Sequence, residues 1–81
     1  MARVLLSGAL RHHAGGRAEL SIEAPTYREL LAALEARFPG IAPLIEGRTS
    51  LAIDGEIIPD PLLEPIPEES EIHFVPRVAG G

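Results

Sequence analysis

The stretch TYRELLAALEARF, residues 26–38, decides the fold because its apolar residues recur with a helical period. The apolar residues are Leu30, Leu31, Leu34 and Phe38. Their spacing of i, i+1, i+4 and i+8 places them on one stripe of a helix. Thr26 followed by Glu29 has the spacing of an N-terminal capping box, and Pro39-Gly40 ends the helix. The stretch therefore predicts an amphipathic helix that must bury its stripe against a second layer.

Two strands are predicted before this helix. Residues 2–7 alternate as in a strand whose outer face carries Arg3, Leu5 and Ser7. The inward face then carries Ala2, Val4 and Leu6. Residues 8–17 contain Gly15-Gly16 and no apolar period, which predicts a connecting loop. Residues 18–23 alternate again, so we expect them to return beside the first strand.

The chain after the helix alternates short strands with turns. Residues 41–45 are apolar and short, which predicts a turn or a single helical turn. Residues 49–54 and 56–58 form a hairpin around the tight-turn dipeptide Asp54-Gly55. A proline-rich loop follows, in which Leu62, Leu63 and Ile66 are expected to pin the chain onto the core. The last strand, 71–75, points Ile72 and Phe74 inward and His73 and Val75 outward, and Pro76 ends it.

This order of elements predicts an α+β, ubiquitin-like β-grasp fold. A mixed sheet of four to five strands packs on one main helix, and the first strand pairs with the last. At 81 residues the chain is one domain. We expect residues 1–76 to form it and residues 77–81 to be a tail.

Composition excludes several classes of function. The 12 acidic and 7 basic residues give a net charge of -5, which disfavours nucleic acid and suits a partner with a basic surface. The chain has no cysteine, which rules out thiolate metal sites and a cysteine nucleophile. No apolar run approaches a membrane span and no signal-peptide pattern is present, so a cytoplasmic protein is expected.

The sequence offers few groups for catalysis or cofactor binding. The adjacent His12-His13 have no third ligand nearby, so no metal site is expected. His73 is interpreted as a residue of the sheet surface and not as a general base. Gly15-Gly16 lack the Lys-Ser/Thr that completes a phosphate loop. We expect no bound cofactor and no catalytic residues of an ordinary enzyme.

The tail carries the chemistry that the rest of the chain lacks. Arg77-Val78-Ala79-Gly80-Gly81 follows an ordered strand, and five extended residues reach about 17 Å, enough to enter another protein's active site. A glycine without Cβ leaves an activated carbonyl unshielded and passes through a narrow channel. Val78 and Ala79 would make contacts with the partner protein just outside that channel. The pattern favours Gly81 as an acyl site.

Over essentially its whole length the chain resembles the MoaD/ThiS-like family of ubiquitin-fold sulfur carriers, and most closely the small subunit of molybdopterin synthase. The ending Phe74-Val75-Pro76-Arg77-Val78-Ala79-Gly80-Gly81 carries the likeness. The resemblance implies adenylation of Gly81, with Gly80 as its required neighbour, by an enzyme related to ubiquitin-activating enzymes that uses ATP and Mg²⁺. Sulfur transfer would then give a thiocarboxylate, which a sulfur-accepting enzyme consumes. The resemblance also places Arg11 and Val75 at partner contacts. Leu5 points outward on the strand expected beside that of Val75, so we predict it to contact a partner as well, together with Arg77 in the tail.

Several functions stay open at this point. The resemblance favours molybdopterin synthesis, but Arg77 stands where a second proline is common, and the proline-rich residues 59–70 differ from the family's usual turn. A carrier for cysteine synthesis or tRNA thiolation has a similar pattern. A protein modifier shares the adenylation step, although the absence of lysine excludes isopeptide-linked chains of the protein itself. A β-grasp interaction module with an incidental glycine ending is the remaining alternative.

Overall fold

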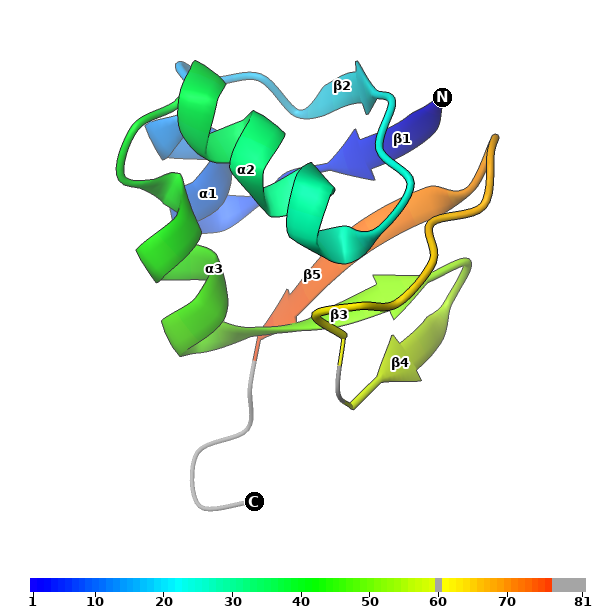
Figure 1. Cartoon of the computed structure of the whole chain (residues 1–81). Helices are drawn as coiled ribbons and strands as arrows, with labels where there is room; N and C mark the ends of the chain where they lie inside the picture. The colour runs from blue at the N-terminus through cyan, green and yellow to red at the C-terminus, as the bar shows by residue number, and fades with distance from the viewer. Residues whose placement is uncertain (60, 77–81) are drawn as a thin grey trace.

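The computed structural model describes residues 1–59 and 61–76, and these form one sheet covered by helices on one side (Figure 1). The elements in chain order are β1 (Ala2–Leu5), α1 (Gly8–His13), β2 (Glu19–Ile22), α2 (Tyr27–Arg37), α3 (Ile41–Arg48), β3 (Thr49–Ile53), β4 (Glu56–Ile58) and β5 (Glu71–Pro76). None of the helices in this described part is long and apolar enough to cross a membrane.

The sheet has the mixed topology that the sequence predicts. Its strand order is β2-β1-β5-β3-β4. β5 lies in the centre, parallel to β1 and antiparallel to β3, while β2 and β4 form the edges through antiparallel pairs. The predicted pairing of first and last strands is therefore confirmed, and the sheet with α2 across one face is a β-grasp arrangement (Figure 1).

The predicted apolar stripe of α2 forms the centre of the core. Leu30 and Leu34 are fully buried, Leu31 is nearly so, and Phe38 packs against the cluster from its edge. They meet the inward side chains of the central strands, such as Val4 and Ile72. Burial of this face supplies the main stabilisation of a small domain.

Residues 8–17 contain a helix, so the prediction of a plain loop is wrong. α1 has six residues and buries only Leu10 along its length, so no apolar period is visible in the sequence. A Schellman motif ends it: the N–H of Gly16 donates to Arg11 O at 2.9 Å, and the N–H of Gly15 to His12 O at 3.1 Å. Both glycines have positive φ, which is why the Gly15-Gly16 pair indicates a helix end as well as a loop.

The apolar segment after Gly40 is a longer helix than predicted. α3 runs over eight residues and buries Ile41 and Ile45, four apart on one face. The carboxylate of Glu35 accepts the N–H groups of Gly40 at 2.7 Å and Ala42 at 2.9 Å, and these two hydrogen bonds lower its pKa. This capping group comes from α2, so local sequence around α3 does not reveal it.

Two further details differ from the prediction. The Thr26 hydroxyl donates to the Glu29 carboxylate and makes no bond to the backbone of α2, so the capping box is not formed in its usual way. In the proline-rich loop only Ile66 is buried, while Leu62 and Leu63 are 55% and 70% exposed. Backbone hydrogen bonds hold this loop to α2 and its approach, so the leucine side chains are left in solvent. The bonds run from Tyr27 N to Glu64 O, from Arg28 N to Leu62 O and from Ile66 N to Pro25 O.

Candidate functional site

The strand that leads to the tail is held on both sides. Parallel β1 and antiparallel β3 flank β5, and the ladder with β3 extends to the pair Thr49 and Pro76. β1 pairs with β5 only as far as His73, so the end of β5 at Pro76 is held in place by its pairing with β3. Residues 77–81 lie outside the described residues, and the predicted roles of Arg77, Val78, Ala79, Gly80 and Gly81 remain predictions.

A row of side chains crosses the sheet on the face that the helices leave open. Leu5 lies opposite His73, His73 opposite Ala52, and Ala52 opposite Ile57. The strand neighbours of Leu5, His73 and Ala52 are buried in the core, so period two puts these three side chains on the outer face, together with Ile57, the partner of Ala52. Ala52 is small and only 3% exposed, so the larger side chains around it make up the accessible surface. We call Leu5, His73, Ala52 and Ile57 the outer-face row.

Val75 extends this row toward the end of β5. It lies two residues beyond His73 on the same face and is 36% exposed, while Ile57 is 51% exposed. The structure thus places the predicted contacts Leu5 and Val75 on neighbouring strands and the same face. Exposed apolar side chains grouped on one face are typical of a protein interface.

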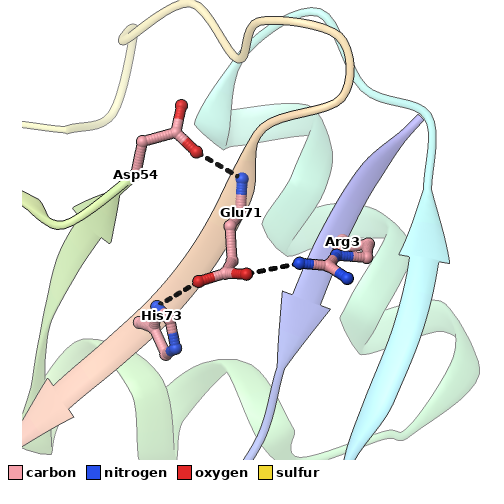
Figure 2. Close-up of polar contacts among 4 residues, drawn as sticks. All are labelled: Arg3, Asp54, Glu71 and His73. Carbon is pink, nitrogen blue, oxygen red and sulfur yellow. Dashed lines mark hydrogen bonds and ion pairs between the residues drawn. The ribbon is translucent and has the colours of Figure 1, made fainter.

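A polar cluster borders the outer-face row on its side away from the tail (Figure 2). The Glu71 carboxylate accepts a hydrogen bond from the guanidinium of Arg3, and its second oxygen lies 3.8 Å from His73 Nδ1. Asp54 accepts the backbone N–H of Glu71 at 2.8 Å, and the Asp54 N–H donates to Glu71 O at 2.8 Å. The cluster joins β1, β5 and the turn between β3 and β4, and it places the Glu71 carboxylate beside the ring of His73.

Arg11, the third described residue predicted to contact a partner, is not part of this face. It lies on α1, where its Nε donates to Gly16 O at 3.0 Å. α1 contacts α3 in the helix layer, so Arg11 lies among the helices and not on the outer face of the sheet. In this structure Arg11 stabilises the end of its own helix.

The described residues contain no assembled catalytic centre. No group of three histidine or acidic side chains within residues 1–59 and 61–76 is placed to hold a metal ion. His13 is bound to the backbone instead, with its Nε2 2.7 Å from Pro39 O. Among the described residues that line a groove of about 280 Å³ beside Tyr27 and Ile58, Glu46 is the one that carries a carboxylate.

Sequence reasoning missed Ala52 and Ile57, although a signal for them was present. The predicted turn at Asp54-Gly55 has two residues, both with positive φ, and such a turn fixes the pairs on either side of it. Counting back from the turn pairs Ala52 with Ile57, on the face opposite Leu51 and Ile53. This register places Ala52 and Ile57 side by side. That they continue the row from His73 can be predicted only if β3 is known to lie beside β5.

Comparison with known proteins decides the family. The sequence model of the ThiS family matches residues 4–81. The chain belongs to the ThiS family. It is therefore a small ubiquitin-like protein of the sulfur-carrier class, and carriers of this class are generally not catalytic themselves. No curated protein matches the sequence.

Solved structures with the same fold span different sulfur-carrier and modifier proteins. A chain of the Amycolatopsis orientalis BexX/CysO complex is 22% identical, with a TM-score of 0.85 over 100% of both chains. Small archaeal modifier protein 1 of Methanosarcina acetivorans is 24% identical, with a TM-score of 0.81 over 99% of this chain and 95% of that one. A chain of the complex of subunits 1 and 2 of the Helicobacter pylori molybdopterin-converting factor is 24% identical, with a TM-score of 0.69 over 99% and 97%.

At these identities the structural likeness shows the fold. It confirms the predicted β-grasp class, and two of the three structures contain a protein complex.

Proposed function

We propose that this ThiS-family chain carries sulfur as a thiocarboxylate on Gly81. The observation that supports the proposal most is that the family match runs through residue 81 and so includes Gly80-Gly81. The described residues offer a fixed exit strand and an apolar outer face, but no nucleophile paired with a base. Such a chain suits the role of a cosubstrate whose activation is performed by a partner.

The chemistry needs two steps on one carboxylate. A Gly81 carboxylate oxygen attacks the α-phosphorus of ATP, pyrophosphate leaves, and an acyl-adenylate forms. Hydrosulfide then attacks the carbonyl carbon, AMP leaves, and loss of the remaining proton gives the thiocarboxylate. If a persulfide of the donor attacks instead, AMP leaves and an acyl disulfide forms, and a thiol then cleaves its S–S bond to release the thiocarboxylate and a disulfide of the donor. An activating partner related to ubiquitin-activating enzymes would hold ATP and Mg²⁺, and the chain contributes an unshielded carbonyl at a residue without Cβ.

The outer-face row with Val75 is proposed as the docking surface for such partners. It lies on the strands beside the exit of the tail, so a protein bound there would have the tail within reach. A net charge of -5 favours partners with basic surfaces. Arg77, Val78 and Ala79 would make the contacts that guide Gly81 into the partner's active site.

For the acceptor of sulfur we propose the large subunit of a molybdopterin synthase. The support is the likeness of the tail to that of the small subunit, and the fold shared with a molybdopterin-converting factor subunit. Cysteine synthesis and tRNA thiolation are the alternatives, since a chain of the BexX/CysO complex shares the fold as well.

Intact-mass spectrometry tests this function. The chain is incubated with ATP, Mg²⁺, a sulfur donor and the ubiquitin-activating-like enzyme of its own genome, with a reaction lacking ATP as control. We expect a gain of about 16 Da, sulfur for oxygen at Gly81, only when ATP is present. Absence of the gain with every activating enzyme of that genome would refute the proposal. Adding a molybdopterin synthase large subunit or a cysteine synthase then identifies the acceptor by which one removes the sulfur.

A further inference from the structure

A second surface feature adjoins the point where β5 ends, on the helix side of the sheet. It is a groove of about 190 Å³ between α1, α3 and the end of β5 (Figure 1). Leu10, Leu44 and Phe74 give it an apolar floor, and the exposed Arg48 and Pro76 stand at its rim. Because Phe74 is buried beneath the helices, the groove lies on the opposite face of β5 from the outer-face row.

The groove has the size of one apolar side chain. An apolar cavity of about 150 Å³ already admits a benzene-sized group, so this groove can receive a leucine or phenylalanine side chain. It can be reached from solvent, because the rim residues Ser7, Gly8 and Ala9 are exposed and a Cβ added at Gly8 would meet no heavy atom within 4 Å. The part that another protein would fill is therefore apolar and open.

Arg48 gives the groove a positive charge. Its side chain makes no ion pair or hydrogen bond with another residue in the described part of the chain. None of the described residues that line the groove is acidic. In a chain whose net charge is -5, this site thus favours the opposite charge from the rest of the surface. A guanidinium matches a carboxylate with two parallel hydrogen bonds, so the groove is complementary to an apolar side chain beside an aspartate or glutamate.

The position of the groove indicates which kind of protein binds there. Five residues follow Pro76 in the sequence, and such a length reaches at most about 17 Å, so an enzyme that acts on Gly81 must bring its own surface close to the end of β5. A sulfur-accepting enzyme can recognise the thiocarboxylate itself. The activating enzyme meets an ordinary terminal carboxylate and has to recognise the chain by its folded surface.

We propose that the groove binds an apolar side chain of the activating enzyme, flanked by a carboxylate that pairs with Arg48. The inference rests on the proposed function, in that an activating enzyme acts on Gly81. With the outer-face row, it gives the end of β5 a contact surface on each face of the sheet. The competing occupants are a sulfur-accepting enzyme and solvent alone.

Arginine variants of the full chain test the charged part of the groove. Calorimetry with the activating enzyme of the same genome should show a dissociation constant raised about tenfold in Arg48→Glu, with Arg48→Lys in between. Arg28→Glu on α2 is the matched control, because Arg28 is exposed and the substitution changes the net charge by the same amount. Equal affinities of Arg48→Glu and Arg28→Glu would overturn the pairing with Arg48.

A variant that fills the groove tests its apolar part. Ala9 is exposed on α1 and lines the groove, so Ala9→Phe should occupy it and raise the dissociation constant by a similar factor. Ala32→Phe, at an exposed position of α2, is the control. In ATP–pyrophosphate exchange, Ala9→Phe should raise KM for the chain and leave kcat unchanged, because the groove does not touch the reacting carboxylate. Normal binding by a folded Ala9→Phe variant, with the melting temperature of Ala32→Phe, would overturn the proposal.

Binding and mass gain separate this inference from the proposed function. A native chain that gains about 16 Da while both groove variants bind like their controls keeps the function and rejects the groove. A native chain that binds the enzyme through the groove but never gains mass rejects the function and keeps the groove. Groove variants that bind the activating enzyme normally but lose a sulfur-accepting enzyme would overturn the choice of occupant, and absence of both binding and mass gain would overturn both proposals.

Discussion

The two faces of β5 differ in almost every respect. On one face Ile72 and Phe74 are buried beneath α2 and contribute to the core. On the other, His73 and Val75 lie at the surface in line with Leu5 and Ile57. One strand therefore contributes to the core on one side and to the proposed docking surface on the other, and the glycine tail follows it in the sequence. Changes on the two faces should have separable effects.

The largest effect on stability is expected at the centre of the covered face. Leu34 is fully buried, so Leu34→Ala should lower the free energy of unfolding by about 2–5 kcal/mol through loss of contacts and cavity formation. The matched control is Leu63→Ala, because Leu63 is 70% exposed and the change should stay within about 0.5 kcal/mol. Urea denaturation measures both. Similar values for the two variants would mean that the stripe of α2 does not form the core.

A smaller loss is expected where the helices of the covered face meet. Gly40 has φ +95°, and an added Cβ would lie 3.1–3.2 Å from the ring of His13. Gly40→Ala should cost about 1–2 kcal/mol from the left-handed backbone alone. Gly47→Ala in α3 is the control, because that glycine has open space around it and alanine favours a helix. Denaturation of the two variants should give effects of opposite sign, and a shared sign would contradict this account.

A pH-dependent loss is expected at the same junction. Hydrogen bonds from Gly40 and Ala42 lower the pKa of Glu35, so its stabilising effect is present above the pKa of an unfolded glutamate. That effect disappears as the pH falls through the lower pKa of the folded protein. The difference in melting temperature between the native chain and Glu35→Gln should therefore be largest near neutral pH and vanish in acid. Glu46→Gln serves as control, and a Glu35→Gln difference that grows in acid would contradict the assignment.

The smallest effect on stability is expected on the open face. Val75→Asp should change the free energy of unfolding by no more than about 0.5 kcal/mol, because the side chain is already partly in water. It should nevertheless weaken binding to an activating or sulfur-accepting partner, as measured by calorimetry. Leu63→Asp, equally apolar but away from the outer-face row, is the control. Equal affinities of the two variants would show that the row is not the docking surface.

The sequence predicts features with a strong period and misses those made by distant partners. The stripe around Leu34 and the alternation in β5 repeat often enough to be recognised, and both are confirmed. α1 buries too few side chains to show a period. The carboxylate of Glu35 reaches α3 from another helix. Such contacts depend on tertiary structure, which also explains why Leu62 and Leu63 were wrongly expected to be buried.

The residues of the candidate site also divide into those that the alternation of a strand predicts and those that depend on tertiary structure. Leu5 and Val75 could be assigned to one face from alternation alone, because period two fixes the face of a strand residue. Arg11 could not be assigned to a face from alternation, because it lies on α1, a helix that the sequence did not predict. His73 was recognised as a surface residue, and alternation along β5 puts Glu71 on the same face. The contact between Glu71 and Arg3 needed the register between β1 and β5.

Removal of Gly81 tests most directly whether the folded domain and the reactive end are separate parts. The full chain and the chain lacking Gly81 are compared by intact mass after incubation with ATP, activating enzyme and sulfur donor, and by melting temperature. We expect the full chain to gain about 16 Da and the shortened chain to gain nothing, because the missing residue withdraws the acyl carbon by about 3.5 Å from its required position. The two melting temperatures should agree, since a terminal residue adds little to stability. An equal mass gain in the shortened chain would contradict the assignment of Gly81 as the site that carries sulfur.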